Sequence, residues 1–393
     1  MVNSVVATLA LVTLVWAALY LSYEALKLKN KFEWLRIGPF YLMVKSKRFN
    51  DILKNTSAKH SRILNAVFDL GALIGYVLMG LAGYSLIIAL VNYLKYQDKV
   101  GTVEVLIPGV TISMETFLKM IPAIVIILFS HELFHKIALH ANGVPVKKVG
   151  IFIFYLIPGA FVEPDEELFT SSHPKVKMRV LAAGSLINIL IGLSFAPLAL
   201  NEGLYNALIS PFYSEPSGVL VKEIIPGSPM ANQSSIKVGD VITKINNIPI
   251  KNVADVKGIN LKPGDKAVIE YLDRALNEKR TIELTAQPDP NNSSRGILGY
   301  KALPYYPPKY SFLDPLMPIH LHEVLFWIFF LNLNVAVFNM MPIAPLDGYG
   351  HLNALIEWLK VSSAISKTIS YAMLITYLSL LVVNVFLRYL PLS

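Results

Sequence analysis

The sequence contains no cysteine, which excludes disulfide bonds and thiolate metal ligands. It is also poor in charge, because only 16% of its 393 residues are charged while 54% are hydrophobic. This composition excludes an ordinary soluble enzyme and predicts a polytopic α-helical membrane protein. No recognisable nucleic-acid-binding module is present, so nucleic acid is not expected to be the partner that the net charge of +8 attracts.

Six segments are apolar over a length that can cross a bilayer. No basic residue precedes the first segment, and its apolar run is too long for the hydrophobic region of a signal peptide. We therefore expect it to be a retained span. The six predicted transmembrane helices lie at about 4–26, 65–95, 115–140, 177–200, 321–342 and 363–387.

The loop at 27–62 sets the expected orientation. It holds ten Lys and Arg residues and two acidic residues. By the positive-inside rule this loop is cytoplasmic, which puts the N-terminus outside a cell membrane. Anionic lipid headgroups of the bilayer are the expected partner of this basic loop, which accounts for most of the net charge.

The most informative motif is His131-Glu132-Leu133-Phe134-His135. Two imidazoles at i and i+4 share one helix face and can bind one Zn²⁺, and the glutamate between them can act as a general base. The preceding run at 121–130 is almost wholly apolar, and ionisable residues inside a span are functional by default. The motif thus indicates hydrolysis within the membrane, against the alternative of two histidines satisfied by neighbouring side chains. His140 points to the opposite helix face, so we do not expect it to be a ligand.

A third ligand is expected near the end of the fifth span. Pro342 and Pro345 should break the helix there and leave Asp347 at membrane depth, on the cytoplasmic side where the histidines are expected. A carboxylate completes a His₂-carboxylate zinc site with one open position. His351 is the competing ligand, or a hydrogen-bond partner of Asp347. Asp347 can also serve as a helix N-cap.

Three other features lie near the motif. Residues 144–162 predict a membrane-associated β-hairpin on the cytoplasmic side, either a plain surface hairpin or one whose edge at 148–157 pairs with an extended substrate. The acidic stretch 163–167 is a solvated loop, a gate or a source of a ligand. In the fourth span, Gly184 permits close helix approach, and Asn188 needs a partner, either another helix or a substrate carbonyl.

Composition changes sharply from about Gly218 to Leu284, where short alternating strands are separated by turns. This pattern predicts an inserted soluble α+β domain, which lies outside the cell because it connects the fourth and fifth spans. The predicted organisation is two leading helices with the basic loop at 1–114, a catalytic membrane core at 115–200, the soluble domain at 215–290, and the rest of the membrane core at 319–393.

The chain resembles the site-2 protease family of intramembrane zinc metalloproteases. The resemblance rests on the His131–His135 motif, on Gly184-x-x-x-Asn188, and on Asn339-x-x-Pro342 followed by Leu346-Asp347-Gly348. The soluble segment resembles a PDZ domain at 218–221, 226–231 and 236–247. The stretch 158–163 is similar to the branch with archaeal and eukaryotic members, whereas Ser185 stands where many relatives have proline.

The resemblance implies specific roles. His131, His135 and Asp347 would bind zinc, Glu132 would activate water, and Asn188 and Asn339 would orient the substrate or stabilise an oxyanion. The implied substrates are single-pass transmembrane proteins, usually trimmed first by an upstream protease of the site-1 type. The release of a membrane-tethered regulator, or regulated intramembrane proteolysis, is the usual consequence.

Two alternatives come from other classes. A membrane metal-ion transporter also places His, Glu and Asp in spans, but it should show internal repeats, which this sequence does not display. A catalytically inactive PDZ-bearing scaffold would have no need for Glu132 between the histidines.

Overall fold

The computed structural model describes residues 2–32, 34–45, 47–154, 157–232, 235–290 and 292–390. The chain forms two compact units, Met1–Ala196 with Phe326–Ser393, and Pro197–Leu325. The helices are α1 (Val2–Ala25), α2 (Leu28–Lys31), α3 (Lys47–Lys59), α4 (Ser61–Tyr96), α5 (Met114–Ala141), α6 (Glu166–Ser171), α7 (Pro174–Leu200), α8 (Glu202–Ile209), α9 (Val253–Gly258), α10 (Met317–Asn339), α11 (Asp347–Trp358) and α12 (Ser363–Tyr389). The strands are β1 (Leu35–Ile37), β2 (Tyr41–Lys45), β3 (Val146–Phe154), β4 (Ile157–Pro164), β5 (Val219–Ile224), β6 (Val241–Ile245), β7 (Ile248–Pro249), β8 (Lys266–Asp273), β9 (Glu278–Thr285), β10 (Gln287–Asp289), β11 (Asn292–Ile297) and β12 (Tyr300–Pro304).

Five helices of the described chain are long and apolar enough to cross a membrane, namely α4, α5, α7, α10 and α12. They coincide with the second to sixth predicted spans, although α10 ends at Asn339 rather than at 342. It stops there because Pro342 has no backbone N–H to donate and its ring clashes with a preceding helical turn. The first predicted span is helical as α1, and the count of six spans stays a prediction.

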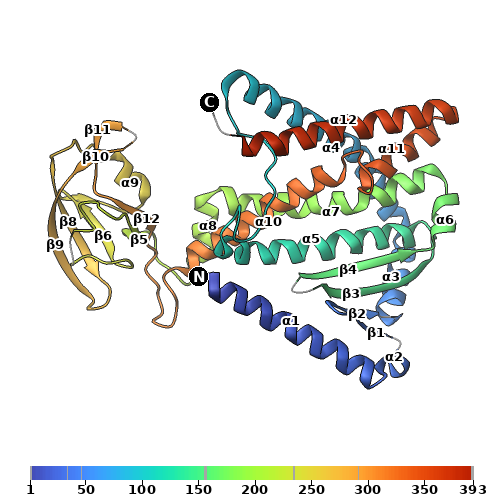
Figure 1. The fold of residues 1–393 in the computed structure, drawn as a ribbon, viewed down its shortest axis with the longest axis horizontal. Coiled ribbons are helices and arrows are strands. Elements are labelled where there is room, and N and C mark those ends of the chain that lie inside the picture. The colour runs from blue at the N-terminus through green and yellow to red at the C-terminus, as the bar shows by residue number, and fades with distance from the viewer. Residues whose placement is uncertain are drawn as a thin grey trace. The chain divides into compact units, whose positions relative to one another are not determined.

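Helix α4 packs against several other elements of the first unit. Small residues let helix backbones approach closely in membrane proteins, and three glycines of α4 meet three other elements: Gly71, Gly75 and Gly83. A Cβ atom at these positions would come within 2.9 Å of Leu186 on α7, His351 on α11 and Tyr377 on α12, respectively. Figure 1 shows α4 running beside α12.

The first unit also holds a four-stranded antiparallel sheet in the order β1-β2-β3-β4. The basic loop predicted at 27–62 thus contributes two strands, since β2 pairs with β3 from Tyr41 opposite Phe154 to Lys45 opposite Gly150. The prediction of an unpaired strand edge at 148–157 is therefore wrong for β3, because β3 pairs with β2 on one side and with β4 on the other. Among the described residues, β4 is the edge strand of this sheet, and it packs beside α5 (Figure 1).

The acidic stretch continues into α6. Asp165 is the N-cap of this helix, and its carboxylate accepts a hydrogen bond from the backbone N–H of Leu168 at 3.3 Å. Glu166 and Glu167 follow in the first turn, where negative charge complements the helix dipole. These three side chains cap and begin a helix; the side chain of Glu163 lies outside the described residues.

The second unit contains a sheet in the order β12-β5-β6-β8-β9, with β7 paired to β6. Its core is a cluster of buried aliphatic residues around Tyr271 and Ile269, because alternate residues of β8 face inward. The strands expected between 218 and 284 all lie in this sheet, which also includes β12, beyond residue 290.

Candidate metal centre

Helix α5 carries the two histidines to one face. The helix begins at an N-cap, Ser113, whose side chain accepts a hydrogen bond from the backbone N–H of Thr116. It then runs without interruption through the apolar segment to His131 and His135, whose ring centroids lie 4.6 Å apart. The regular spacing of the helix alone therefore brings the two imidazoles together, as the sequence predicts.

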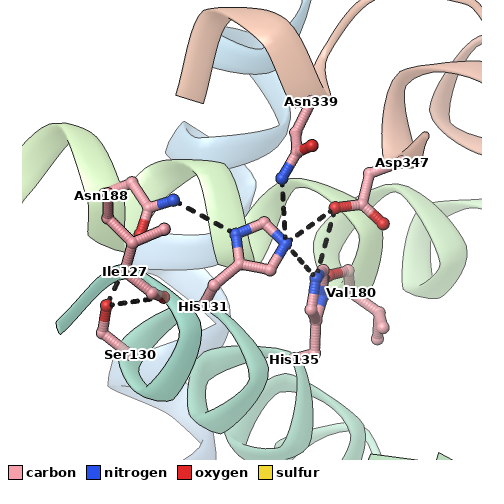
Figure 2. A network of polar contacts seen from close by, with 8 residues as sticks. All are labelled: Ile127, Ser130, His131, His135, Val180, Asn188, Asn339 and Asp347. Atoms are coloured by element: carbon pink, nitrogen blue, oxygen red, sulfur yellow. Dashed lines mark hydrogen bonds and ion pairs between the residues drawn. The ribbon is translucent and has the colours of Figure 1, made fainter. Parts of the chain in front are cut away.

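Asp347 reaches the same point from the other end of the chain. The segment after α10 leaves the helical path through Pro342 and Pro345, and α11 then starts at Asp347. The N-cap of α11 is Leu346, so the alternative of Asp347 as the cap is wrong. Its carboxylate points instead at the two rings (Figure 2), with Oδ2 lying 3.1 Å from His131 Nε2 and 3.3 Å from His135 Nε2.

These three side chains fit a zinc ion. The two Nε2 atoms lie 3.0 Å apart, so the three potential ligand atoms form a nearly equilateral triangle. Ligands of tetrahedral zinc at about 2.05 Å lie about 3.3 Å from one another. Two imidazole nitrogens and a carboxylate oxygen at this spacing need a shared cation or proton, because their lone pairs repel one another. The only metal-capable group found among the described residues is this one.

Helix α7 contacts the ring of His135 at Nδ1, the nitrogen that does not face Asp347. His135 Nδ1 lies 2.7 Å from the backbone carbonyl oxygen of Val180, to which it can donate only in its protonated form. A proton on Nδ1 leaves the Nε2 lone pair directed at Asp347 and His131. This arrangement, with a carbonyl behind the ligand, is typical of metal-binding histidines.

Two asparagines converge on His131 from different helices (Figure 2). The amide nitrogen of Asn188 on α7 lies 3.3 Å from His131 Nδ1, and the amide nitrogen of Asn339, the last residue of α10, lies 3.4 Å from His131 Nε2. Asn188 is fully buried. Both asparagines therefore contact the ring of His131, and their part in orienting a substrate stays a prediction.

Glu132 lies on the same helix as the histidines, but it does not belong to the group of three potential ligands. It is half-buried and close enough to His135 to interact with it electrostatically. Glu132 therefore lies beside the potential ligands without being one of them, and its part as a general base stays a prediction.

The remaining histidine candidates have other partners. His351 is fully buried, with Nε2 3.0 Å from the carbonyl oxygen of Ala72 on α4 and its ring 4.3 Å from that of Tyr76. It joins α11 to α4, and it lies outside the group that could hold a metal. His140 is also turned away, because its Nε2 contacts the side-chain oxygen of Asn50 on α3 at 3.2 Å.

Two contacts were not anticipated from the sequence. The carbonyl of Val180 is a backbone atom, so no residue type marks it. Gly184 was expected to allow close helix approach, and it is the ring of His131 that occupies the space: a Cβ atom there would lie 2.5 Å from His131 Cε1. The Gly184-x-x-x-Asn188 pattern was the available signal, since both residues face His131 from α7.

Comparisons with known proteins agree with this geometry. A family model described as peptidase family M50 matches residues 119–383. An uncharacterized protein of Methanocaldococcus jannaschii is 29% identical over 61% of this chain and 58% of its own length. A membrane-bound transcription factor site-2 protease homolog of Arabidopsis thaliana is 23% identical over 53% of this chain and 40% of its own length. The chain thus spans about half the length of these curated relatives.

Among solved structures, the PDZ domain of an SdrC-like protein from Listeria monocytogenes matches 22% of this chain and 87% of its own length, with 21% identity and a TM-score of 0.19. The family model, in contrast, covers well over half of the chain and includes both histidines and Asp347. The chain therefore belongs to peptidase family M50, the site-2 protease family of zinc metalloproteases.

Proposed function

We propose that this protein is a zinc-dependent endopeptidase that cleaves transmembrane segments of single-pass membrane proteins. The observation that carries the proposal is the convergence of His131 and His135, on a helix long and apolar enough to cross a membrane, with Asp347 at the start of α11. Ionisable groups at that depth are costly, and a hydrolytic metal site is a function that requires them.

The three residues would hold the zinc ion through His131 Nε2, His135 Nε2 and Asp347 Oδ2. When bound, zinc supplies Lewis acidity, which lowers the pKa of water and polarises a carbonyl. Helix α7 keeps the rings in place through the contacts described above, so the ligands are oriented before the metal arrives.

Glu132 moves the proton in this proposal. Its carboxylate takes a proton from the attacking water and gives it to the amine nitrogen of the leaving peptide.

Asn339 is suited to orient the substrate. Its amide nitrogen lies 3.4 Å from His131 Nε2, an atom that cannot accept a hydrogen bond while its lone pair is used by a metal. The N–H groups of Asn339 are then available to the carbonyl oxygen of the scissile bond. Donors placed where negative charge develops stabilise the transition state of acyl transfer.

The substrate must be unwound before it can react, because the peptide bonds of a helix are held in its own hydrogen-bond ladder. Strand β4 offers a place for the unwound segment, since it is the last strand of its sheet among the described residues and lies beside α5. An extended peptide could add to this edge through main-chain hydrogen bonds. The PDZ-like unit outside and an earlier cut by a site-1-type protease would restrict which substrates arrive.

The test is cleavage of a model single-span substrate by the purified protein in liposomes, with bound zinc quantified. Glu132→Gln should abolish cleavage and keep near-stoichiometric zinc, whereas Asp347→Ala should lose both. Glu167→Gln, an exposed acid in the first turn of α6, is the matched control and should cleave normally. Retained cleavage in Glu132→Gln would refute the role of the base. Zinc transport into the liposomes without cleavage would favour the transporter alternative.

A further inference from the structure

The ring of His131 must present the right nitrogen. If the proposed zinc site is correct, on which this inference rests, Nε2 carries the lone pair and the proton of the neutral ring sits on Nδ1. For His135 the Val180 carbonyl enforces this state. His131 needs an equivalent acceptor at its own Nδ1, and the side chain that lies there is Asn188.

The surroundings of Asn188 form a short polar chain inside the helix pair (Figure 2). One end of its amide lies 3.3 Å from His131 Nδ1, and the other end lies 3.4 Å from Ser130 Oγ. Ser130 Oγ in turn lies 2.7 Å from the backbone carbonyl oxygen of Ile126, one turn earlier in α5. Asn188 is fully buried, so water cannot replace any of these partners.

Hydrogen-bond accounting decides which end of the amide faces the ring, because the oxygen and nitrogen ends have nearly the same shape. A hydroxyl has one hydrogen, and the short contact assigns that of Ser130 to Ile126. Ser130 Oγ is then an acceptor toward Asn188, which places the amide N–H groups on the Ser130 side. The amide is consequently turned end for end relative to its orientation in Figure 2, so that its oxygen faces His131 Nδ1. The opposite orientation would need an unprotonated Nδ1, and the proton on Nε2 would block the metal.

We infer that Asn188 is a positioning residue for His131: its side-chain carbonyl accepts the Nδ1 proton and so holds the Nε2 lone pair toward the metal. Donation runs in one direction, from His131 to Asn188, from Asn188 to Ser130 and from Ser130 to the carbonyl of Ile126. Each buried polar atom in this series of hydrogen bonds then has a partner, as buried polar atoms require.

Three residues on one side of α7 lie against the two histidine rings. Val180, Gly184 and Asn188 are spaced four apart on one side of α7, behind the two rings. Val180 fixes His135, Gly184 makes room for the ring of His131, and Asn188 fixes its tautomer. The role differs from the substrate-orienting one implied by resemblance, because Asn188 acts on the ligand rather than on the peptide.

The test measures zinc affinity of the full-length protein in detergent by competition with a chromophoric chelator. Asn188→Leu keeps the volume and removes the acceptor, and it should weaken zinc binding by about 10- to 100-fold, as loss of such partners does in other zinc sites. Asn188→Asp restores an acceptor and should bind zinc at least as tightly as the wild type. Asn332→Leu is the matched control, since Asn332 is another fully buried asparagine, one that donates to Ile328 of its own helix.

A second readout separates positioning from substrate contact. At saturating zinc, Asn188→Leu should recover most of the cleavage activity that it loses at limiting zinc, whereas a substrate-orienting residue would remain defective. Equal zinc affinity in wild type and Asn188→Leu, or an Asn188→Asp variant as weak as Asn188→Leu, would overturn the inference alone. A wild-type protein that binds no zinc would overturn the proposed function as well, and Asn188→Asp keeps the test decisive if Asn188→Leu fails to fold.

Discussion

Gly184→Ala should damage the metal site without touching a ligand. The ring of His131 lies against the Cα of Gly184, and an added Cβ would fall 2.5 Å from His131 Cε1 and 2.6 Å from both ring nitrogens. Carbon atoms in ordinary contact lie about 3.5–4.0 Å apart, so the ring or the helix must move by about 1 Å. Neither can give way easily, because Nδ1 and Nε2 are both engaged on other sides.

The size of the effect follows from the tolerance of the site. Zinc–ligand distances vary by only about 0.2 Å, so a displacement of about 1 Å removes His131 from a productive position. We expect zinc affinity to fall by roughly 100-fold, which is about 2.8 kcal/mol at 1.4 kcal/mol per tenfold change. Cleavage measured at limiting zinc should fall in parallel.

Chelator competition in detergent measures the affinity, and cleavage of the single-span substrate measures the activity. Gly80→Ala is the matched control, because Gly80 is also a helical glycine of the first unit but a Cβ there would meet nothing within 4 Å. It should bind zinc and cleave like the wild type. Wild-type zinc affinity in Gly184→Ala would refute the reasoning, since it would mean that the ring of His131 does not rest on α7.

Three further predictions concern the surroundings of the site. His351→Leu should weaken zinc binding several-fold and lower the free energy of unfolding by about 1 kcal/mol, because one hydrogen bond between α11 and α4 is lost; unchanged values would show that α11 is held elsewhere. A double-mutant cycle of Asp69→Ala and Arg179→Ala should give a coupling of about 1 kcal/mol in thermal unfolding, since the carboxylate and guanidinium are joined by two contacts of 2.7 and 2.8 Å; additive effects would contradict it. Removing zinc with a chelator should lower the melting temperature of the wild type and leave that of Asp347→Ala unchanged. If free zinc had been 1,000-fold above Kd, the folded wild type loses about 4 kcal/mol of stabilisation.

The metal group was predictable because most of its geometry is local. A spacing of four places His131 and His135 on one helix face, and two prolines mark where Asp347 can leave a helix. The meeting of these elements across 216 residues is not local, and only their shared cytoplasmic side and the family resemblance indicated it. The position of the histidine motif in an apolar helix also followed from composition.

Other features left little trace in the sequence. Strands β1 and β2 are short and lie in a basic loop, and their partner β3 is about 100 residues away, so strand pairing decides their structure. His351 was assigned to the metal region because it lies one turn after Asp347, whereas its actual partner is a backbone carbonyl on α4. Contacts to backbone atoms, such as the carbonyls of Ala72 and Val180, cannot be predicted from residue type.

The packing of α4 has a consequence for how the peptidase segment can be divided. The family model begins at residue 119, after α4 has ended, yet α12 donates to α4 through Tyr377 to Met79 at 2.9 Å and through Asn384 to Leu86 at 3.0 Å. A fragment that starts at α5 would lose both acceptors, and the hydroxyl of Tyr377 would then face lipid without this partner. We therefore expect such a fragment to be unstable, and a separate peptide that carries α4 should complement it in trans through Gly71, Gly75 and Gly83.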